Sequence, residues 1–242
     1  MKKIFKDKPN CRKIVTLVVS LVLLAITTGL ILTSMILFKD PDPNKKITHF
    51  NLETFFLRYS QLFYFTNLTN YFSLITLLLM CFSQKHVIRR LFFHSIVLIS
   101  ITFLVYWGLI SWSSNWNNIF ESYKSLHTHL INPLIMFIFA YIWKDKLKIP
   151  SKDKYMTLIY VFVYFGFAFI LFISTYYLKY NKEGGIVIYS FLDFFHPFFY
   201  KGNNLDIKLL LNFVIVLIGV GLPILIFKFW YKVLGLSNKK TS

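Results

Sequence analysis

Apolar residues occur along this sequence in six long blocks, separated by short polar segments. The blocks cover residues 14–38, 62–82, 91–112, 126–143, 155–178 and 207–230. Each is close to or above the length of about 20 apolar residues that a helix needs to cross the hydrocarbon core of a bilayer. The pattern predicts an all-α polytopic membrane protein with six transmembrane helices. Because the connections are short, we expect residues 1–242 to form a single domain.

Composition agrees with this prediction. Hydrophobic residues make up 56% of the chain, and the mean hydropathy is +0.58. A water-soluble domain of this length has too little interior to hide so much apolar surface. The net charge of +17 does not indicate nucleic acid as a partner, because the Lys and Arg residues lie in short runs between apolar blocks. Such runs are typical of topology signals and of contacts with anionic lipid.

The distribution of positive residues predicts the orientation. The two ends of the chain and the connections on their side of the membrane carry 18 Lys and Arg residues, against nine on the other side. Positive residues concentrate on the cytoplasmic side, so we expect both termini there, which agrees with an even number of crossings. The many Lys, Asn, Ile, Phe and Tyr residues and the few Ala residues are typical of an AT-rich bacterial genome. We therefore expect a bacterial plasma membrane.

Polar residues within an apolar block are informative because lipid penalises them. In block 62–82 they gather in the outer half, and Thr66, Asn70 and Ser73 have the spacing of one helix face. The inner half, residues 74–80, is almost wholly apolar. This asymmetry predicts a water-accessible cavity that opens toward the outer side of the membrane.

Block 126–143 also has its polar residues at the outer end, in Leu126-His127-Thr128-His129 and Asn132-Pro133. Pro133 has no amide hydrogen, so the carbonyl four residues earlier, that of His129, loses its helical partner. We expect a bend and a free acceptor beside an imidazole. His127, and His94 at the inner end of block 91–112, are expected to be solvated.

Three segments resemble motifs of one family when taken in order. They are Phe63-Tyr64-Phe65-Thr66-Asn67-Leu68-Thr69-Asn70, His129-Leu130-Ile131-Asn132-Pro133 and Ile188-Tyr189-Ser190-Phe191-Leu192-Asp193. The chain resembles the androgen-induced-gene family of intramembrane threonine hydrolases and its bacterial six-helix relatives. Ser190 stands where that family usually has proline. His127 competes with His129 for the family's histidine, and the distance to Pro133 favours His129.

The resemblance implies an integral membrane hydrolase of lipid-like esters near the outer membrane face, with Thr66 as nucleophile and His129 as base. A histidine is suited to this role because its ordinary pKa is near 6.5, and a threonine hydroxyl needs such a base. Asn67 and Asn70 are candidate donors to the ester oxygen. Asp193 either orients an imidazole or caps the turn before block 207–230.

The expected substrate is a membrane lipid or another fatty acyl ester within the bilayer, with Asn67, Asn70, Tyr189 and Phe191 as its binding residues. We predict no cofactor. His127, His129, His196 and Asp193 are expected on one membrane face, but they lack the spacing of zinc motifs, so no metal is predicted.

Two other classes of function are also compatible with the sequence. One is a substrate-binding or transport component of the membrane without hydrolytic activity, and the other is a structural partner protein. No ionisable residue lies deep in a block and no inverted repeat is visible, which is evidence against a transporter.

Overall fold

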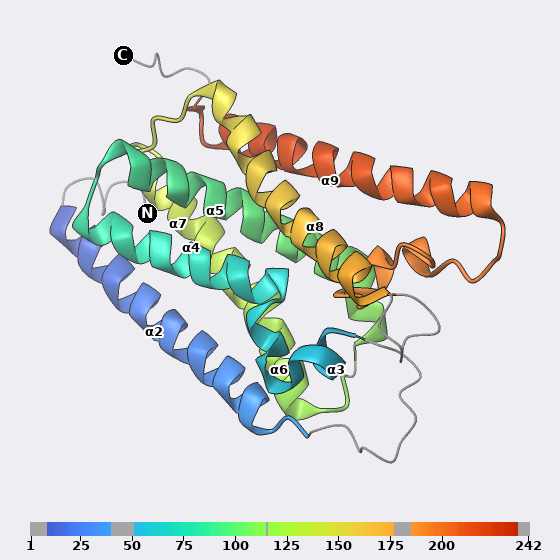
Figure 1. Cartoon of the computed structure of the whole chain (residues 1–242). Coiled ribbons are helices and arrows are strands. Elements are labelled where there is room, and N and C mark those ends of the chain that lie inside the picture. Colours follow the sequence, from blue (N-terminus) through green and yellow to red (C-terminus); the bar gives the residue numbers. More distant parts are fainter. Residues whose placement is uncertain (1–8, 40–50, 115, 177–184, 237–242) are drawn as a thin grey trace.

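A computed structural model describes residues 9–39, 51–114, 116–176 and 185–236. The described residues form helices but no β-strand. Asn51 and Val187 form one isolated β-bridge. Six helices are long and apolar enough to cross a membrane, and Figure 1 shows how the helices are arranged. The all-α fold with six apolar helices is thereby confirmed. Residues 1–8, 40–50, 177–184 and 237–242, which carry part of the charge used for the orientation, lie outside the described residues.

The helices agree closely with the apolar blocks. The long ones are α2 (Pro9–Ile36), α4 (Phe65–Phe82), α5 (His86–Val105), α7 (Asn132–Trp143), α8 (Lys154–Tyr176) and α9 (Leu205–Val233). Two short helices, α3 (Leu52–Phe56) and α6 (Ile119–Leu126), precede α4 and α7. Helix α6 continues into α7 through a π-helical turn, so that Ile119–Trp143 is one continuous helical element.

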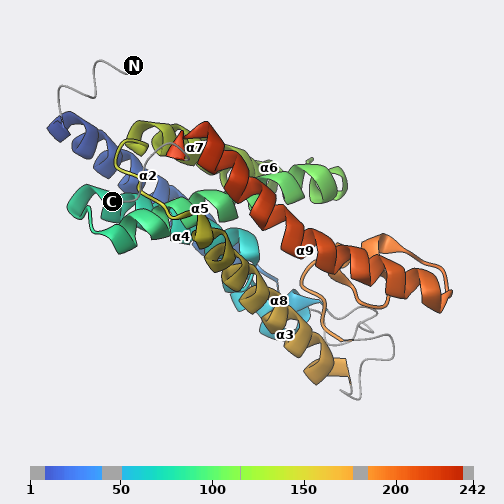
Figure 2. The ribbon, with the colours of Figure 1, turned by 90° about the horizontal axis from the view of Figure 1, so that it is seen from above.

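Helix α5 lies at the centre of the bundle and is the most buried of the six. Helix α4 packs on one side of it, with α2 on the far side of α4, and α8 and α9 pack on the other side of α5 (Figure 1). The start of α2 and the end of α9 lie at the same end of the bundle (Figures 1 and 2). Helices α3 and α6 lie at the other end, called here the α3 end.

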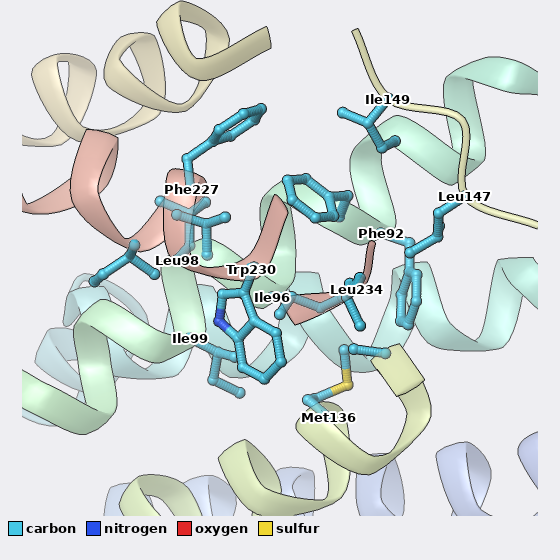
Figure 3. Packing of buried hydrophobic residues seen from close by; sticks show 14 of the residues in the cluster. Phe92, Ile96, Leu98, Ile99, Met136, Leu147, Ile149, Phe227, Trp230 and Leu234 are labelled. Carbon is cyan, nitrogen blue, oxygen red and sulfur yellow. The ribbon is translucent and has the colours of Figure 1, made fainter. Parts of the chain in front are cut away.

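The main hydrophobic core lies toward the end opposite α3, where α4, α5, α7 and α9 meet (Figure 3). Phe92 and Met136 are fully buried there, and Trp230 is 8% exposed. The Trp230 indole donates a hydrogen bond of 2.8 Å to the Ser100 hydroxyl, so its polar atom is satisfied inside the core. On the outer surface many large apolar side chains are exposed, as expected of helices that face lipid.

The expectation that His94 and His127 are solvated is wrong. His94 is 2% exposed, and its Nδ1 lies 2.8 Å from the Thr157 hydroxyl. His127 is 1% exposed, and its Nε2 lies 3.1 Å from the Thr27 hydroxyl. In each case a neighbouring helix covers the ring and supplies a hydroxyl group that satisfies one ring nitrogen.

Candidate functional site

Two π-helical turns meet at the α3 end of the bundle. One covers Tyr106–Ile110 at the end of α5, and the other covers His127–Ile131 between α6 and α7. In each, an amide bonds to the carbonyl five residues earlier, Ser111 to Tyr106 and Asn132 to His127. Such turns are rare and frequently occur at functional sites. The irregularity that the sequence predicts near Pro133 is therefore a π-helical turn.

The His129 carbonyl was expected to be a free acceptor, and the structure supplies its partner. The Trp107 indole donates to this oxygen at 3.0 Å. The neighbouring Tyr106 ring lies on the His129 imidazole, with 3.5 Å between centroids and 8° between planes. The two π-helical turns are thus joined by a hydrogen bond and a stacked pair, which together fix the position of the imidazole.

His129 lines a cavity at the α3 end that also contains Thr66. The cavity measures about 200 Å³, and its wall includes Thr66, Asn67, His129 and Tyr189; we call it the polar cavity. The His129 side chain is largely buried, and its Nδ1 has no hydrogen-bond partner among the described residues. An unsatisfied buried nitrogen of this kind is unfavourable unless something occupies the site. His127 is not among the residues that line this cavity.

Thr66 is the second residue of α4, where backbone amides have no partner within the helix. Its amide donates to the Tyr189 hydroxyl at 3.4 Å. Burial raises the pKa of the Tyr189 phenol, which keeps this group neutral and able to donate. No direct hydrogen bond joins Thr66 to His129 in the described part of the chain; the two residues lie in the wall of one cavity.

A second cavity, of about 110 Å³, adjoins the first and has an almost wholly apolar wall; we call it the apolar cavity. It lies between α5, α8, α9 and the segment that contains Phe191. Four residues line both cavities, namely Thr66, Tyr106, Ile110 and Tyr189. Thr66 therefore lies at the boundary between a polar space and an apolar one.

The other residues predicted to bind substrate differ in whether they line one of the two cavities. Asn67 lines the polar cavity, and its amide donates to the Gln61 carbonyl at 2.6 Å. Phe191 lines the apolar cavity. Asn70 lines neither cavity and is fully buried. Its amide nitrogen lies 2.8 Å from the Thr66 carbonyl and 3.1 Å from the Thr128 carbonyl, so this side chain ties α4 to the second π-helical turn.

Asp193 has partners close to it in sequence. Its carboxylate accepts the Phe195 amide at 2.8 Å and lies 3.0 Å from Nδ1 of His196. The first of these bonds is the local pattern of an Asx turn. Asp193 is not among the described residues that line either cavity, so the structure does not bring it together with Thr66 and His129.

Three aromatic residues of the site were not predicted from sequence. Tyr106 and Trp107 position His129, as described above, and the Tyr164 hydroxyl accepts the Phe65 amide at 3.0 Å. Near the end of an apolar block, the Tyr106-Trp107 pair is indistinguishable from ordinary interfacial aromatics. Gly108, a poor helix former directly after the pair, is a local signal that could have indicated an irregular turn.

The arrangement defines a helical bundle of membrane type with a cavity whose wall contains Thr66 and the buried His129. The described residues contain no group of three or more His, Cys, Asp or Glu side chains that could hold a metal ion. Comparison with family models, curated proteins and solved structures finds no match.

Proposed function

We propose that this chain is a multi-pass protein of a bacterial plasma membrane that hydrolyses lipid-like esters, with Thr66 as nucleophile and His129 as base. One observation carries the proposal: Thr66 lies where a polar cavity that contains His129 adjoins an apolar cavity. An ester of a fatty acid has the same division, a polar carbonyl group next to an apolar chain. The resemblance to the intramembrane threonine hydrolases supports the same assignment.

The membrane location and orientation belong to the same proposal. Six long apolar helices with exposed Leu, Ile, Phe and Val side chains support insertion in a bilayer. The described loop between α7 and α8 and the end of α9 are rich in lysine, which supports a cytoplasmic position for that end. The α3 end and its two cavities would then lie near the outer face.

In the proposed reaction, the substrate carbonyl lies between Thr66 and His129 in the polar cavity. The Thr66 oxygen attacks the carbonyl carbon while a ring nitrogen of His129 takes the hydroxyl proton. Collapse of the intermediate breaks the bond to the alcohol, which leaves with that proton. A water molecule then attacks the acyl-threonine with His129 again as base, and the acid and the free Thr66 hydroxyl are released.

The negative oxygen of the intermediate needs hydrogen-bond donors. Asn67 uses one amide hydrogen for the Gln61 carbonyl, and its second is available on the wall of the polar cavity. The Tyr189 hydroxyl, beside Thr66, is a second candidate. Loss of one such donor typically costs about 3 kcal/mol of transition-state stabilisation. Asn70 is excluded from this role by its bonds to Thr66 and Thr128.

The decisive experiment is covalent labelling of the purified full-length protein with a fluorophosphonate probe, followed by mass mapping of the adduct. We expect the adduct on Thr66, with labelling lost in Thr66→Ala and His129→Gln and kept in Thr66→Ser. Thr76→Ala and His127→Gln are matched controls, since both residues are buried on the same helical elements but line neither cavity. These two variants should be labelled like the wild type.

If Thr66→Ala is labelled to the same extent as the wild type, the proposed hydrolase function is wrong. Stoichiometric binding of an unreacted ester by the wild type, without labelling or turnover, would instead favour a substrate-binding component of the membrane.

A further inference from the structure

A cavity at the end of the bundle opposite α3 has a basic rim. It measures about 400 Å³ and lies between the start of α8 and the end of α9. Its lining residues are Ser151, Lys154, Phe227, Lys228, Tyr231 and Lys232. On α9, the spacing of four residues places Lys228 with Lys232 and Phe227 with Tyr231, and the two rings are stacked with centroids 5.7 Å apart. The cavity therefore combines an aromatic floor with a rim of ammonium groups.

The charge of this rim is not balanced by described residues. Lys154, Lys228 and Lys232 have no ion-pair partner in residues 9–39, 51–114, 116–176 and 185–236. The two carboxylates of the connection between α7 and α8 are already paired with arginines. Asp145 lies 3.2 Å from Arg12, and Asp153 lies 2.6 Å from Arg90. Three like charges around one cavity repel one another, and a bound anion would relieve that repulsion.

We propose that this cavity binds the headgroup of an anionic phospholipid. The phosphate would lie among the three ammonium groups, with the Ser151 hydroxyl as a further donor. The glycerol and the first acyl carbons would lie on Tyr231 and the aliphatic stems of the lysines. The position of the cavity along the helices favours a lipid as the ligand. It lies at the start of α8 and the end of α9, and the ends of membrane-spanning helices are where lipid headgroups contact a protein. This site is remote from Thr66 and does not depend on the proposed hydrolysis.

A zwitterionic lipid fits the same cavity less well, since its choline or ethanolamine cation adds a fourth positive charge. Each lysine near the surface is worth about 1 kcal/mol toward anionic lipid, or roughly fivefold in affinity. We therefore expect selectivity for the anionic headgroup that falls with each lysine removed and with rising salt concentration.

The test is native mass spectrometry of the delipidated full-length protein in detergent, titrated with phosphatidylglycerol or with phosphatidylcholine. We expect tighter binding of phosphatidylglycerol and a loss of more than about tenfold in Lys228→Gln/Lys232→Gln. The matched control is Lys201→Gln/Lys208→Gln, which removes the same charge near the opposite end of α9 and should bind like the wild type. Melting temperatures check that both double variants are folded.

Equal losses in the two double variants would overturn the site, because they would show an effect of net charge alone. A Lys228→Gln/Lys232→Gln protein that binds phosphatidylglycerol like the wild type would overturn it as well. In a further arm, inorganic phosphate is added to the lipid-bound protein. Failure of millimolar phosphate to displace the lipid supports the phospholipid as ligand, and full displacement would assign the cavity to free phosphate instead.

Discussion

The Tyr106 ring lies flat on the His129 imidazole, with 3.5 Å between centroids and 8° between planes. Both residues belong to π-helical turns, one ending α5 and the other leading into α7. The pair therefore couples the position of the proposed base to the geometry of two irregular turns from different helices. It also places an aromatic face over a ring whose Nδ1 has no partner in the described residues.

Tyr106→Leu should reduce the rate of fluorophosphonate labelling by about twofold to tenfold, because a stacked pair is worth about 0.5–1.5 kcal/mol beyond its buried area. Tyr106→Phe keeps the ring and removes only the hydrogen bond to the Ser114 hydroxyl, so it should be labelled at nearly the wild-type rate. Labelling kinetics at several probe concentrations measure both. Equal rates for the two variants would contradict a positioning role for the ring.

The helices were predictable because bilayer thickness imposes one length and one composition on each crossing. The π-helical turns were not, since their hydrogen-bond register depends on how two helix ends meet. Pro133 indicates only that the His129 carbonyl loses a partner. It does not identify the Trp107 indole that replaces that partner, because Trp107 lies on a different helix.

The same limit applies to single polar residues. Thr66 and His129 were predicted as a pair, and the structure places both in the wall of one cavity. Asn67 and Asn70 are equivalent in sequence, yet only Asn67 lines a cavity, because Asn70 points into the contact between α4 and the second π-helical turn. His127 and His129 likewise meet different neighbours, the Thr27 hydroxyl and the Tyr106 ring.

Asn70→Ala should lower stability, whereas Asn67→Ala should lower turnover. Asn70 bonds to two carbonyls and accepts from the Asn132 amide at 2.7 Å, so its removal leaves buried groups unsatisfied at a cost of about 1–3 kcal/mol. Asn67 has one such bond and a place on the cavity wall. Melting temperature in detergent and kcat for a p-nitrophenyl ester separate the two effects. An Asn67→Ala protein with reduced stability and unchanged kcat would exclude Asn67 as an oxyanion donor.

The ion pair of Arg90 and Asp153 should be the most stabilising one that the structure describes. Asp153 is 1% exposed and bonds to the Arg90 guanidinium twice, at 2.6 and 2.9 Å. Asp153→Ala should cost about 2–4 kcal/mol, since it leaves a partly buried charge unpaired. Asp145→Ala is the control, because the Asp145 side chain is 63% exposed and the buried Arg12 guanidinium keeps its contacts with the Ile142 carbonyl and the Trp143 ring, so we expect a loss of less than about 1 kcal/mol. Thermal unfolding of both variants should show a clear difference, and equal shifts would disprove this ranking.

The apolar cavity should set the length of the acyl chain that is accepted. Gly219 lines it, and a Cβ at this position would lie 3.1 Å from a ring carbon of Phe165. Gly219→Val therefore puts two methyl groups into the space proposed for the chain. Each buried methylene is worth about 0.8 kcal/mol, so we expect hydrolysis of p-nitrophenyl decanoate to fall about tenfold relative to the butyrate. Gly221→Val has the same helix propensity and meets no atom within 4 Å, and it should leave the ratio of the two rates unchanged. A ratio that moves equally in both variants would mean that the acyl chain lies elsewhere.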